Sequence, residues 1–264
     1  MRVLLGFLLL SGLAWAQQAP DYAKEGRWAA QVDEALMDGD SVWIENADRE
    51  FLALLTLSES ETKKTAVVVH GLGIHPDWAQ VVQPLRVGLT EHGFNTLSIQ
   101  MPVLANGIAG SEYAPLFGDA DKRLGAAAAF LQAQGLEVDA LVAHSLGAQM
   151  SAHYLANNTH PFKRFVAIGM SKGAAQYLSA IDLPIFDLYG NEDIEPVMQG
   201  IEIKADAAKD NKNYTQKMVS ADHFFNEKDE LLINEVSTWL QSAYCYYWGR
   251  SLALLPGFWA LAVV

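Results

Sequence analysis

Apolar and polar residues follow one another along this chain in blocks that repeat the order strand, helix, strand. Residues 65–70 form an apolar, β-branched run without alternation, which predicts a strand covered on both faces. Further strands are predicted at residues 94–100, 136–143, 164–169, 183–189 and 213–219, and helices between them at residues 76–89, 119–134, 174–180 and 197–208. This rhythm predicts an α/β fold in which a parallel sheet carries helices on both faces.

The two ends of this region add elements of another kind. Residues 17–40 place apolar positions at helical spacing and predict a short packing helix. Residues 42–45 and 50–57 predict two strands joined by a turn, which would lead into the sheet as antiparallel strands. Residues 227–242 predict a final helix with one apolar face.

The chain termini predict an exported protein. Residues 1–16 carry Arg2, an apolar run and the small-residue pattern Ala14-Trp15-Ala16, as a secretory signal peptide with its cleavage site does. We therefore expect a periplasmic or secreted protein with one α/β domain over residues 17–242. Residues 243–264 form a hydrophobic tail, which we expect to pack on the protein body or on a surface. Its apolar part is short for a bilayer span, so membrane association is the less favoured alternative.

Composition narrows the classes of partner. The chain has 264 residues, of which 51% are hydrophobic and 19% charged, which suits one large folded domain. A formal net charge of −13 provides no basic surface for phosphate backbones, so nucleic acid is excluded as an expected partner. Cys245 is the only cysteine, so an exported chain would have no internal disulfide, which suits the bacterial periplasm.

Residues 140–150 carry the strongest chemical signal. An apolar strand stops at Ser145 and the chain restarts as a small-residue helix, as at a nucleophile elbow. Such a turn requires tiny residues two positions before and after the serine, and these are Ala143 and Gly147. The turn would leave the backbone N–H of Leu146 unpaired at a helix start, where a developing oxyanion is stabilised.

Two other segments belong to the same expected site. Residues 70–78 form a glycine-rich loop after a buried strand, and Gly71 and Gly73 would let its backbone approach a ligand and supply a second oxyanion donor. Residues 101–118 form a long passage without periodicity, which is placed to wall a pocket.

A serine nucleophile needs an imidazole base and a carboxylate that orients it. Asp193 and His223 both follow predicted strands and give the chain order Ser, Asp, His. Glu192 is the alternative acid, whereas Asp187 lies within a predicted strand. His144 is expected to point away from the nucleophile, because successive strand side chains alternate faces.

No cofactor is predicted. His70, His75 and Asp77 are close enough in sequence to suggest a metal site, but their spacing fits no ligand template. Support of the loop and of the following helix is the preferred interpretation. The glycines of this loop do not complete a phosphate loop or a dinucleotide fingerprint.

Together, the loop at residues 70–73, the elbow at residues 143–147, Asp193 and His223 resemble the α/β-hydrolase superfamily over residues 42–242. The stretch His75-Pro76-Asp77-Trp78 at the end of this loop is also similar to a bacterial family of uncharacterised exported α/β hydrolases. The resemblance implies a mostly parallel sheet of about eight strands and a Ser145-Asp193-His223 triad. It also implies an oxyanion hole formed by the backbone N–H groups of Leu72 and Leu146.

Two functions follow as alternatives. The first is a secreted serine hydrolase that cleaves a small ester or related acyl substrate through an acyl-enzyme, with amide cleavage by the same triad left open. The second is a non-catalytic envelope binding or scaffold protein that keeps the fold. The sequence does not determine the substrate or the oligomeric state.

Overall fold

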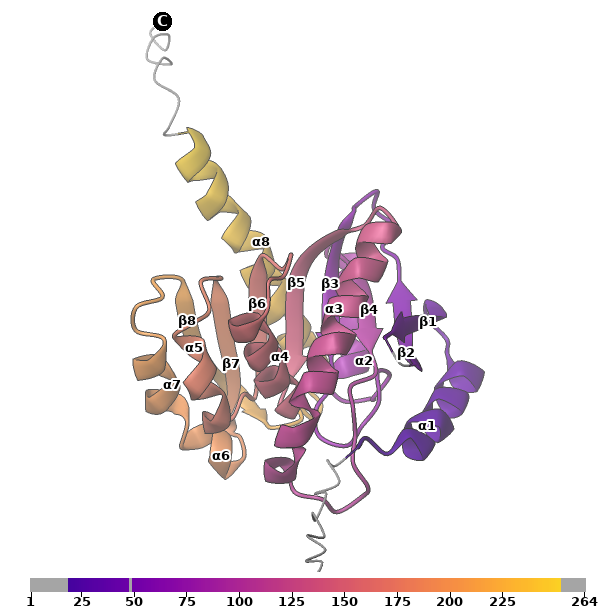
Figure 1. Cartoon of the computed structure of the whole chain (residues 1–264). Coiled ribbons are helices and arrows are strands. Elements are labelled where there is room, and N and C mark those ends of the chain that lie inside the picture. Colours follow the sequence, from indigo (N-terminus) through magenta and orange to yellow (C-terminus); the bar gives the residue numbers. More distant parts are fainter. Residues whose placement is uncertain (1–18, 48, 253–264) are drawn as a thin grey trace, which may run out of the picture.

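The computed structural model describes residues 19–47 and 49–252 and has an eight-stranded sheet at its centre (Figure 1). The strands are β1 (Asp40–Asn46), β2 (Arg49–Thr56), β3 (Lys64–Val69), β4 (Asn95–Ile99), β5 (Glu137–His144), β6 (Arg164–Ile168), β7 (Ile185–Glu192) and β8 (Tyr214–Asp222). Their order across the sheet is β1-β2-β4-β3-β5-β6-β7-β8. Strand β2 is antiparallel to β1 and β4, and the other neighbouring pairs are parallel. The predicted α/β fold with a mostly parallel sheet is therefore confirmed.

Helices cover both faces of this sheet (Figure 1). They are α1 (Tyr22–Ala35), α2 (Val82–Glu91), α3 (Phe117–Ala133), α4 (Leu146–Asn157), α5 (Ala175–Leu178), α6 (Glu195–Met198), α7 (Ile201–Ala207) and α8 (Asp229–Leu252), with short 3-10 helices at Gly110–Leu116 and Lys172–Ala174. Because strand side chains alternate, Val67 and Val69 belong to the core under α3 and α4, whereas Ala66 and Val68 belong to the core under α2 and α8.

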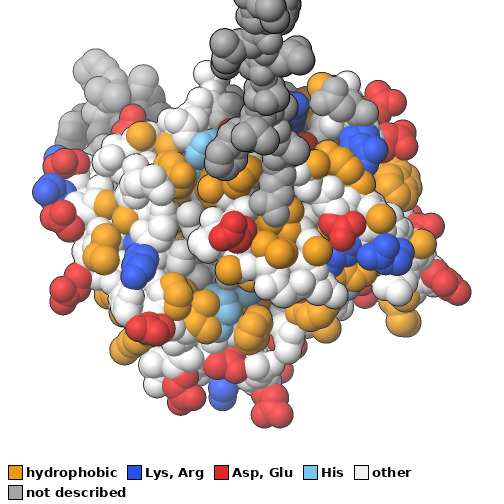
Figure 2. All heavy atoms as spheres, turned by 60° about the horizontal axis from the view of Figure 1, so that its bottom comes forward, with side chains coloured by type: hydrophobic (Ala, Val, Ile, Leu, Met, Phe, Trp, Pro, Cys, Tyr) orange, Lys and Arg blue, Asp and Glu red, His pale blue; other side chains and the backbone are white. Residues whose placement is uncertain are grey.

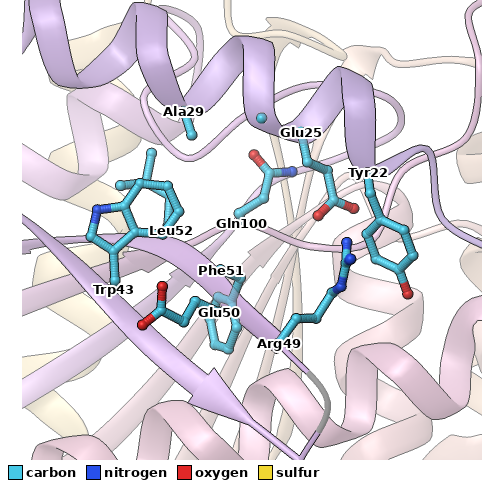
Figure 3. A pocket seen from close by; sticks show the side chains of 10 residues that line it. Tyr22, Glu25, Ala29, Trp43, Arg49, Glu50, Phe51, Leu52 and Gln100 are labelled. Carbon is cyan, nitrogen blue, oxygen red and sulfur yellow. The ribbon is translucent and has the colours of Figure 1, made fainter.

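Helix α1 has a small core of its own. Its residues Ala29 and Val32 are buried against Leu52 and Leu54 of β2. Ala29 and Leu52 also line the pocket shown in Figure 3. Its first turn is capped by Asp21, whose side chain accepts a hydrogen bond from the backbone of Lys24. The predicted packing helix in this region is therefore present, at Tyr22–Ala35.

Several predicted helix boundaries were wrong. Helix α2 begins at Val82 rather than near residue 76, because the residue before it, Val81, has a φ of 64°, outside the right-handed helical region. Helix α3 begins at Phe117, so Asp119 lies in its first turn rather than capping it.

The helix predicted at residues 197–208 is divided into α6 and α7 around Gly200. A Cβ at Gly200 would lie 2.9 Å from the backbone nitrogen of Lys172, so this residue lets two backbone segments approach closely.

The terminal predictions fall mostly outside the described residues. The expected signal peptide at residues 1–16 lies there, as do residues 253–264 of the tail. Helix α8 continues to Leu252 rather than ending at residue 242. No helix within the described ranges combines the length and apolar character needed to cross a bilayer.

The parallel strands bring their carboxyl ends to one edge of the sheet, at the bottom of Figure 1. Strand β3 lies between β4 and β5, so the chain leaves it in one direction and returns on its other side. Ligands of open α/β sheets bind at such a switch point. The loops that follow β3 and β5 are therefore neighbours, and those after β6, β7 and β8 continue along the same edge.

Candidate active site

Ser145 occupies a strained turn between β5 and α4. Its φ and ψ are 54° and −121°, a backbone conformation that residues other than glycine rarely adopt. The turn is fixed from one side by a hydrogen bond of 2.8 Å from the Ser145 backbone nitrogen to the Ile168 carbonyl of β6. From the other side, Gly147 packs on the His70 backbone so closely that a Cβ would lie 2.2 Å from the carbonyl oxygen. The strand, turn and helix predicted at residues 140–150 are therefore formed.

Three distant side chains meet at this turn. The Ser145 Oγ lies 2.9 Å from His223 Nε2, and His223 Nδ1 lies 2.6 Å from Asp193 Oδ1. His223 and Asp193 are 5% and 8% exposed, whereas Ser145 is half-buried. The carboxylate requires a proton on Nδ1, which leaves Nε2 free to accept the serine hydroxyl. The structure thus places Ser145, Asp193 and His223 in one hydrogen-bonded chain.

Asp193 hydrogen-bonds to the imidazole, whereas Asp187 and Glu192 do not. Its carboxylate also accepts hydrogen bonds from the backbone nitrogens of Ile194, at 2.8 Å, and Gly190, at 3.3 Å. Asp187 instead binds the buried ammonium of Lys204, and Glu192 is exposed at the end of β7. The orientation of the Asp193 carboxylate is therefore fixed by backbone donors on its own loop.

Gly169, which follows β6, lies against the His223 ring and was not singled out from the sequence. Its φ is +57°, and a Cβ there would lie 3.0 Å from both Cε1 and Nδ1 of His223. A side chain at this position would therefore press on the imidazole. The available signal was the glycine that ends a buried strand at the same sheet edge as the elbow.

His144 supports His223 from behind. Its Nε2 lies 3.0 Å from the His223 carbonyl oxygen, and the two rings are 4.9 Å apart between centroids. Burial, with the neighbouring His223, lowers the pKa of His144 to about 4, so the ring is neutral. It makes no hydrogen bond to Ser145, and its Nδ1 has no hydrogen-bond partner within the part of the chain described.

The loop after β3 lies against Ser145. A Cβ on Gly71 would be 3.1 Å from the Ser145 Cβ and from His144 Nδ1, so the loop approaches at the distance that only glycine permits. His70 holds the loop: Nε2 accepts the Met101 backbone N–H at 2.8 Å, so Nδ1 donates to the Gly71 carbonyl at 2.9 Å. Burial lowers the pKa of His70 to about 3, which keeps this arrangement neutral.

The two expected oxyanion donors flank Ser145. Leu146 directly follows it at the start of α4, and Leu72 directly follows Gly71. Within the described ranges, neither backbone N–H donates a hydrogen bond to a protein acceptor. Both are therefore free to bind an oxygen of a substrate.

Three exposed apolar residues are sequence neighbours of site residues. Leu72, Ile194 and Phe224 are 41%, 42% and 44% exposed, and each is next to a residue of the site in the sequence. The Phe224 ring packs edge-on against that of His223, with centroids 5.1 Å apart. Figure 2 shows this face of the molecule, with hydrophobic side chains gathered around a histidine. The rim of the site can therefore contact an apolar group.

His70, His75 and Asp77 point to different partners and do not form a metal site. His75 Nδ1 accepts a hydrogen bond from the backbone of Asp77, whose carboxylate binds Arg86, while His70 faces Gly71 and Met101. Within residues 19–47 and 49–252, no three histidine, cysteine or acidic residues are grouped as metal ligands would be.

The fold is shared with solved hydrolase structures of low sequence identity. A dienelactone hydrolase from Anabaena variabilis is 19% identical, with a TM-score of 0.62 over 77% of this chain and 96% of that one. An esterase from Pyrococcus furiosus is 14% identical, with a TM-score of 0.65 over 80% and 95% of the two chains. An alpha-beta serine hydrolase homologue from Coxiella burnetii is 17% identical, with a TM-score of 0.56 over 76% and 98%. The chain thus has the α/β-hydrolase fold.

One family model matches part of the sequence. A family described as a protein of unknown function, DUF3530, matches residues 3–115, which is less than half of the chain. This match includes the loop after β3 and ends before Ser145, Asp193 and His223. Curated proteins gave no match.

Proposed function

We propose that the protein is a serine hydrolase that cleaves a small ester or related acyl substrate through an acyl-enzyme at Ser145. The observation that carries this proposal is the continuous hydrogen-bonded chain from Asp193 through His223 to Ser145. It ends at a half-buried hydroxyl beside two unpaired backbone N–H groups. Esterases and a dienelactone hydrolase among proteins of the same fold are consistent with this chemistry.

In the first half-reaction, the Ser145 Oγ attacks the substrate carbonyl carbon while its proton moves to His223 Nε2. The carbonyl oxygen becomes negative and is bound by the backbone N–H groups of Leu72 and Leu146. When the tetrahedral intermediate collapses, the bond to the leaving oxygen breaks and Nε2 returns the proton to that oxygen. In the second half-reaction, water repeats these steps on the acyl-enzyme and releases the acid and the free serine.

The charges around His223 favour this proton transfer. The imidazolium formed in the reaction would face the Asp193 carboxylate at 2.6 Å, which stabilises it and holds the ring in place. The nearest other ring, His144, has its pKa lowered by burial and stays neutral. It therefore adds no second positive charge against which the imidazolium would have to form.

The alternative of a non-catalytic binding protein is less well supported. A fold kept only for binding has no need of a strained serine backbone, an aligned imidazole and a buried carboxylate in one chain. We propose, in line with the expected signal peptide, that the hydrolase acts outside the cytoplasm on a small-molecule acyl substrate.

A fluorophosphonate probe tests the proposal directly. The full chain should be labelled, and Ser145→Ala should abolish both labelling and hydrolysis of short p-nitrophenyl esters, lowering kcat by about 10⁴-fold or more. Ser151→Ala is a matched control, because Ser151 is buried on α4 without a hydrogen-bond partner in the described structure. Absence of labelling in folded protein would overturn the proposal.

A further inference from the structure

Lys24 of α1 is a buried cation that the mechanism above does not use. It is 5% exposed, and its Nζ donates a hydrogen bond of 3.1 Å to the Leu104 carbonyl. The ammonium also lies 4.5 Å from the centre of the Trp28 ring. Within the described ranges it forms no ion pair with a carboxylate, although buried charges are usually paired. Burial lowers the pKa of Lys24, and Asp21 at the helix cap only partly opposes this.

Tyr113 presents a second donor at the same place. The residue is 1% exposed, and its hydroxyl oxygen accepts the Leu104 backbone N–H at 2.9 Å. The hydroxyl proton itself meets no acceptor among the residues described. Lys24 and Tyr113 thus each make one hydrogen bond to the Leu104 backbone, and each can donate a further hydrogen bond.

Both donors face the space beside Gly73. A Cβ at that glycine would lie 3.7 Å from Lys24 Nζ and 3.7 Å from the Tyr113 hydroxyl oxygen. Gly73 has a φ of +66° and no side chain, so no side chain of its own stands between its backbone and the two donors. The glycine is half-exposed, whereas the two donors behind it are buried. A group that enters here would meet an ammonium and a hydroxyl at once.

This space adjoins the reaction centre. Gly73 is two residues after Gly71, where a Cβ would touch the Ser145 Cβ at 3.1 Å. Two trans peptides span at most about 7 Å between Cα atoms, so Gly73 lies within this distance of Gly71, on the loop that contacts Ser145. Leu72, whose N–H is an expected oxyanion donor, lies between the two glycines.

We infer that Lys24 and Tyr113 bind a carboxylate carried by the substrate, so that the enzyme prefers esters with a free carboxylate a few bonds from the scissile carbonyl. This inference rests on the proposed hydrolase function. A carboxylate has acceptor capacity for both donors and would supply the counter-charge that Lys24 lacks. The apolar rim formed by Leu72, Ile194 and Phe224 would contact the remainder of the substrate.

A pair of matched esters measures this preference. Mono-p-nitrophenyl glutarate carries a free carboxylate, and p-nitrophenyl pentanoate has the same chain length without it. Lys24→Met should lower kcat/KM for the glutarate ester by about tenfold or more, mainly through KM, and change that for the pentanoate ester by less than about twofold. Tyr113→Phe should act in the same direction to a smaller extent. Arg27→Met is the control, because Arg27 is an exposed cation on the same helix.

A purely structural role of Lys24 predicts another result. If it only ties α1 to the segment at Leu104, Lys24→Met would lower activity on both esters equally, or lower thermal stability without changing their ratio. Either outcome overturns the inference, as does an equal rate of the unaltered enzyme on the two esters. Hydrolysis of both esters that still depends on Ser145 would leave the proposed function standing in each case.

A binding measurement separates failure of this inference from failure of the hydrolase proposal. Calorimetry with monomethyl glutarate on the Ser145→Ala chain should show binding, and adding Lys24→Met should weaken it by about tenfold or more. This readout does not require turnover. Binding that Lys24→Met leaves unchanged, or no binding at all, would overturn the inference even if Ser145 were inert towards esters.

Discussion

Two buried aspartates lie six residues apart, in and just after β7, and have different kinds of partner. Asp187, inside β7, is fully buried and binds the ammonium of Lys204, the hydroxyl of Tyr214 and the amide of Gln216. Asp193, just past the end of β7, binds backbone N–H groups and the imidazole of His223. Both are buried carboxylates with several donors.

The difference lies in the partner. Lys204 neutralises Asp187 permanently, so this charge is fixed within the core and contributes to the fold. Asp193 faces an imidazole that can gain a proton and has its other nitrogen on Ser145. Its charge can therefore stabilise a state that exists only during reaction. Burial and hydrogen bonding alone do not distinguish a structural carboxylate from one of the proposed triad, whereas the partner does.

Asp193→Asn should give the largest effect on activity. The amide keeps the shape of the side chain but no longer holds the proton on Nδ1 of His223, so we expect kcat to fall by about 10⁴-fold with a small change in stability. Steady-state ester hydrolysis and urea unfolding measure the two quantities. Activity within tenfold of the unaltered enzyme would remove Asp193 from the triad.

Asp187→Asn should act on the fold instead. The substitution leaves the Lys204 ammonium buried without its counter-charge, and we expect the free energy of unfolding to fall by about 3–5 kcal/mol. The folded fraction should keep kcat within about tenfold, as measured by titrating its active sites with the fluorophosphonate probe. If Asp187→Asn were as inactive as Asp193→Asn while fully folded, the two carboxylates would not differ in the way described.

Gly169→Ala tests how closely the imidazole is held. The new Cβ would lie 3.0 Å from two atoms of His223, and we expect the displaced ring to lower kcat/KM by about 10²-fold. Gly135→Ala is the matched control, because its φ is +72° and no heavy atom lies within 4 Å of the added Cβ. Both should lose about 1 kcal/mol of stability from the left-handed backbone, and only the first should lose activity.

The smallest expected effect concerns pH and His144. The unfolded chain binds a proton at this residue near pH 6.5, whereas its folded pKa is lowered to about 4. Between these values the unfolded state holds more protons, so stability is lost as pH falls, by about 1.4 kcal/mol per pH unit for this group. His144→Gln should make the pH dependence of urea unfolding shallower over that window. An unchanged slope would show that His144 is not buried in its neutral form.

The sequence predicted the parts of this molecule that depend on local pattern. Apolar runs located all eight strands, and the small residues around Ser145 located the elbow. Asp193 and His223 were found because catalytic side chains of this fold follow strand ends, and the structure joins them to Ser145. Their catalytic roles and the oxyanion roles of Leu72 and Leu146 stay predictions until activity is measured.

Contacts between distant segments could not be predicted in this way. Gly169 under His223 and Lys24 beside Gly73 depend on how loops from different strands approach one another. The start of α2 at Val82 follows Val81 with a φ of 64°, which the sequence does not indicate because valine rarely adopts this conformation. No periodicity in the sequence encodes such pairings, because each partner alone resembles an ordinary surface or loop residue.

Gly147 packs on the carbonyl of His70, and Gly71 packs on Ser145. The elbow and the loop after β3 are therefore joined by two close contacts, each made possible by a glycine. Ser145 and Leu72, whose N–H is one of the two expected oxyanion donors, are consequently held near each other by the packing of the protein itself. Replacing either loop with that of another protein of this fold would require replacing the other loop as well.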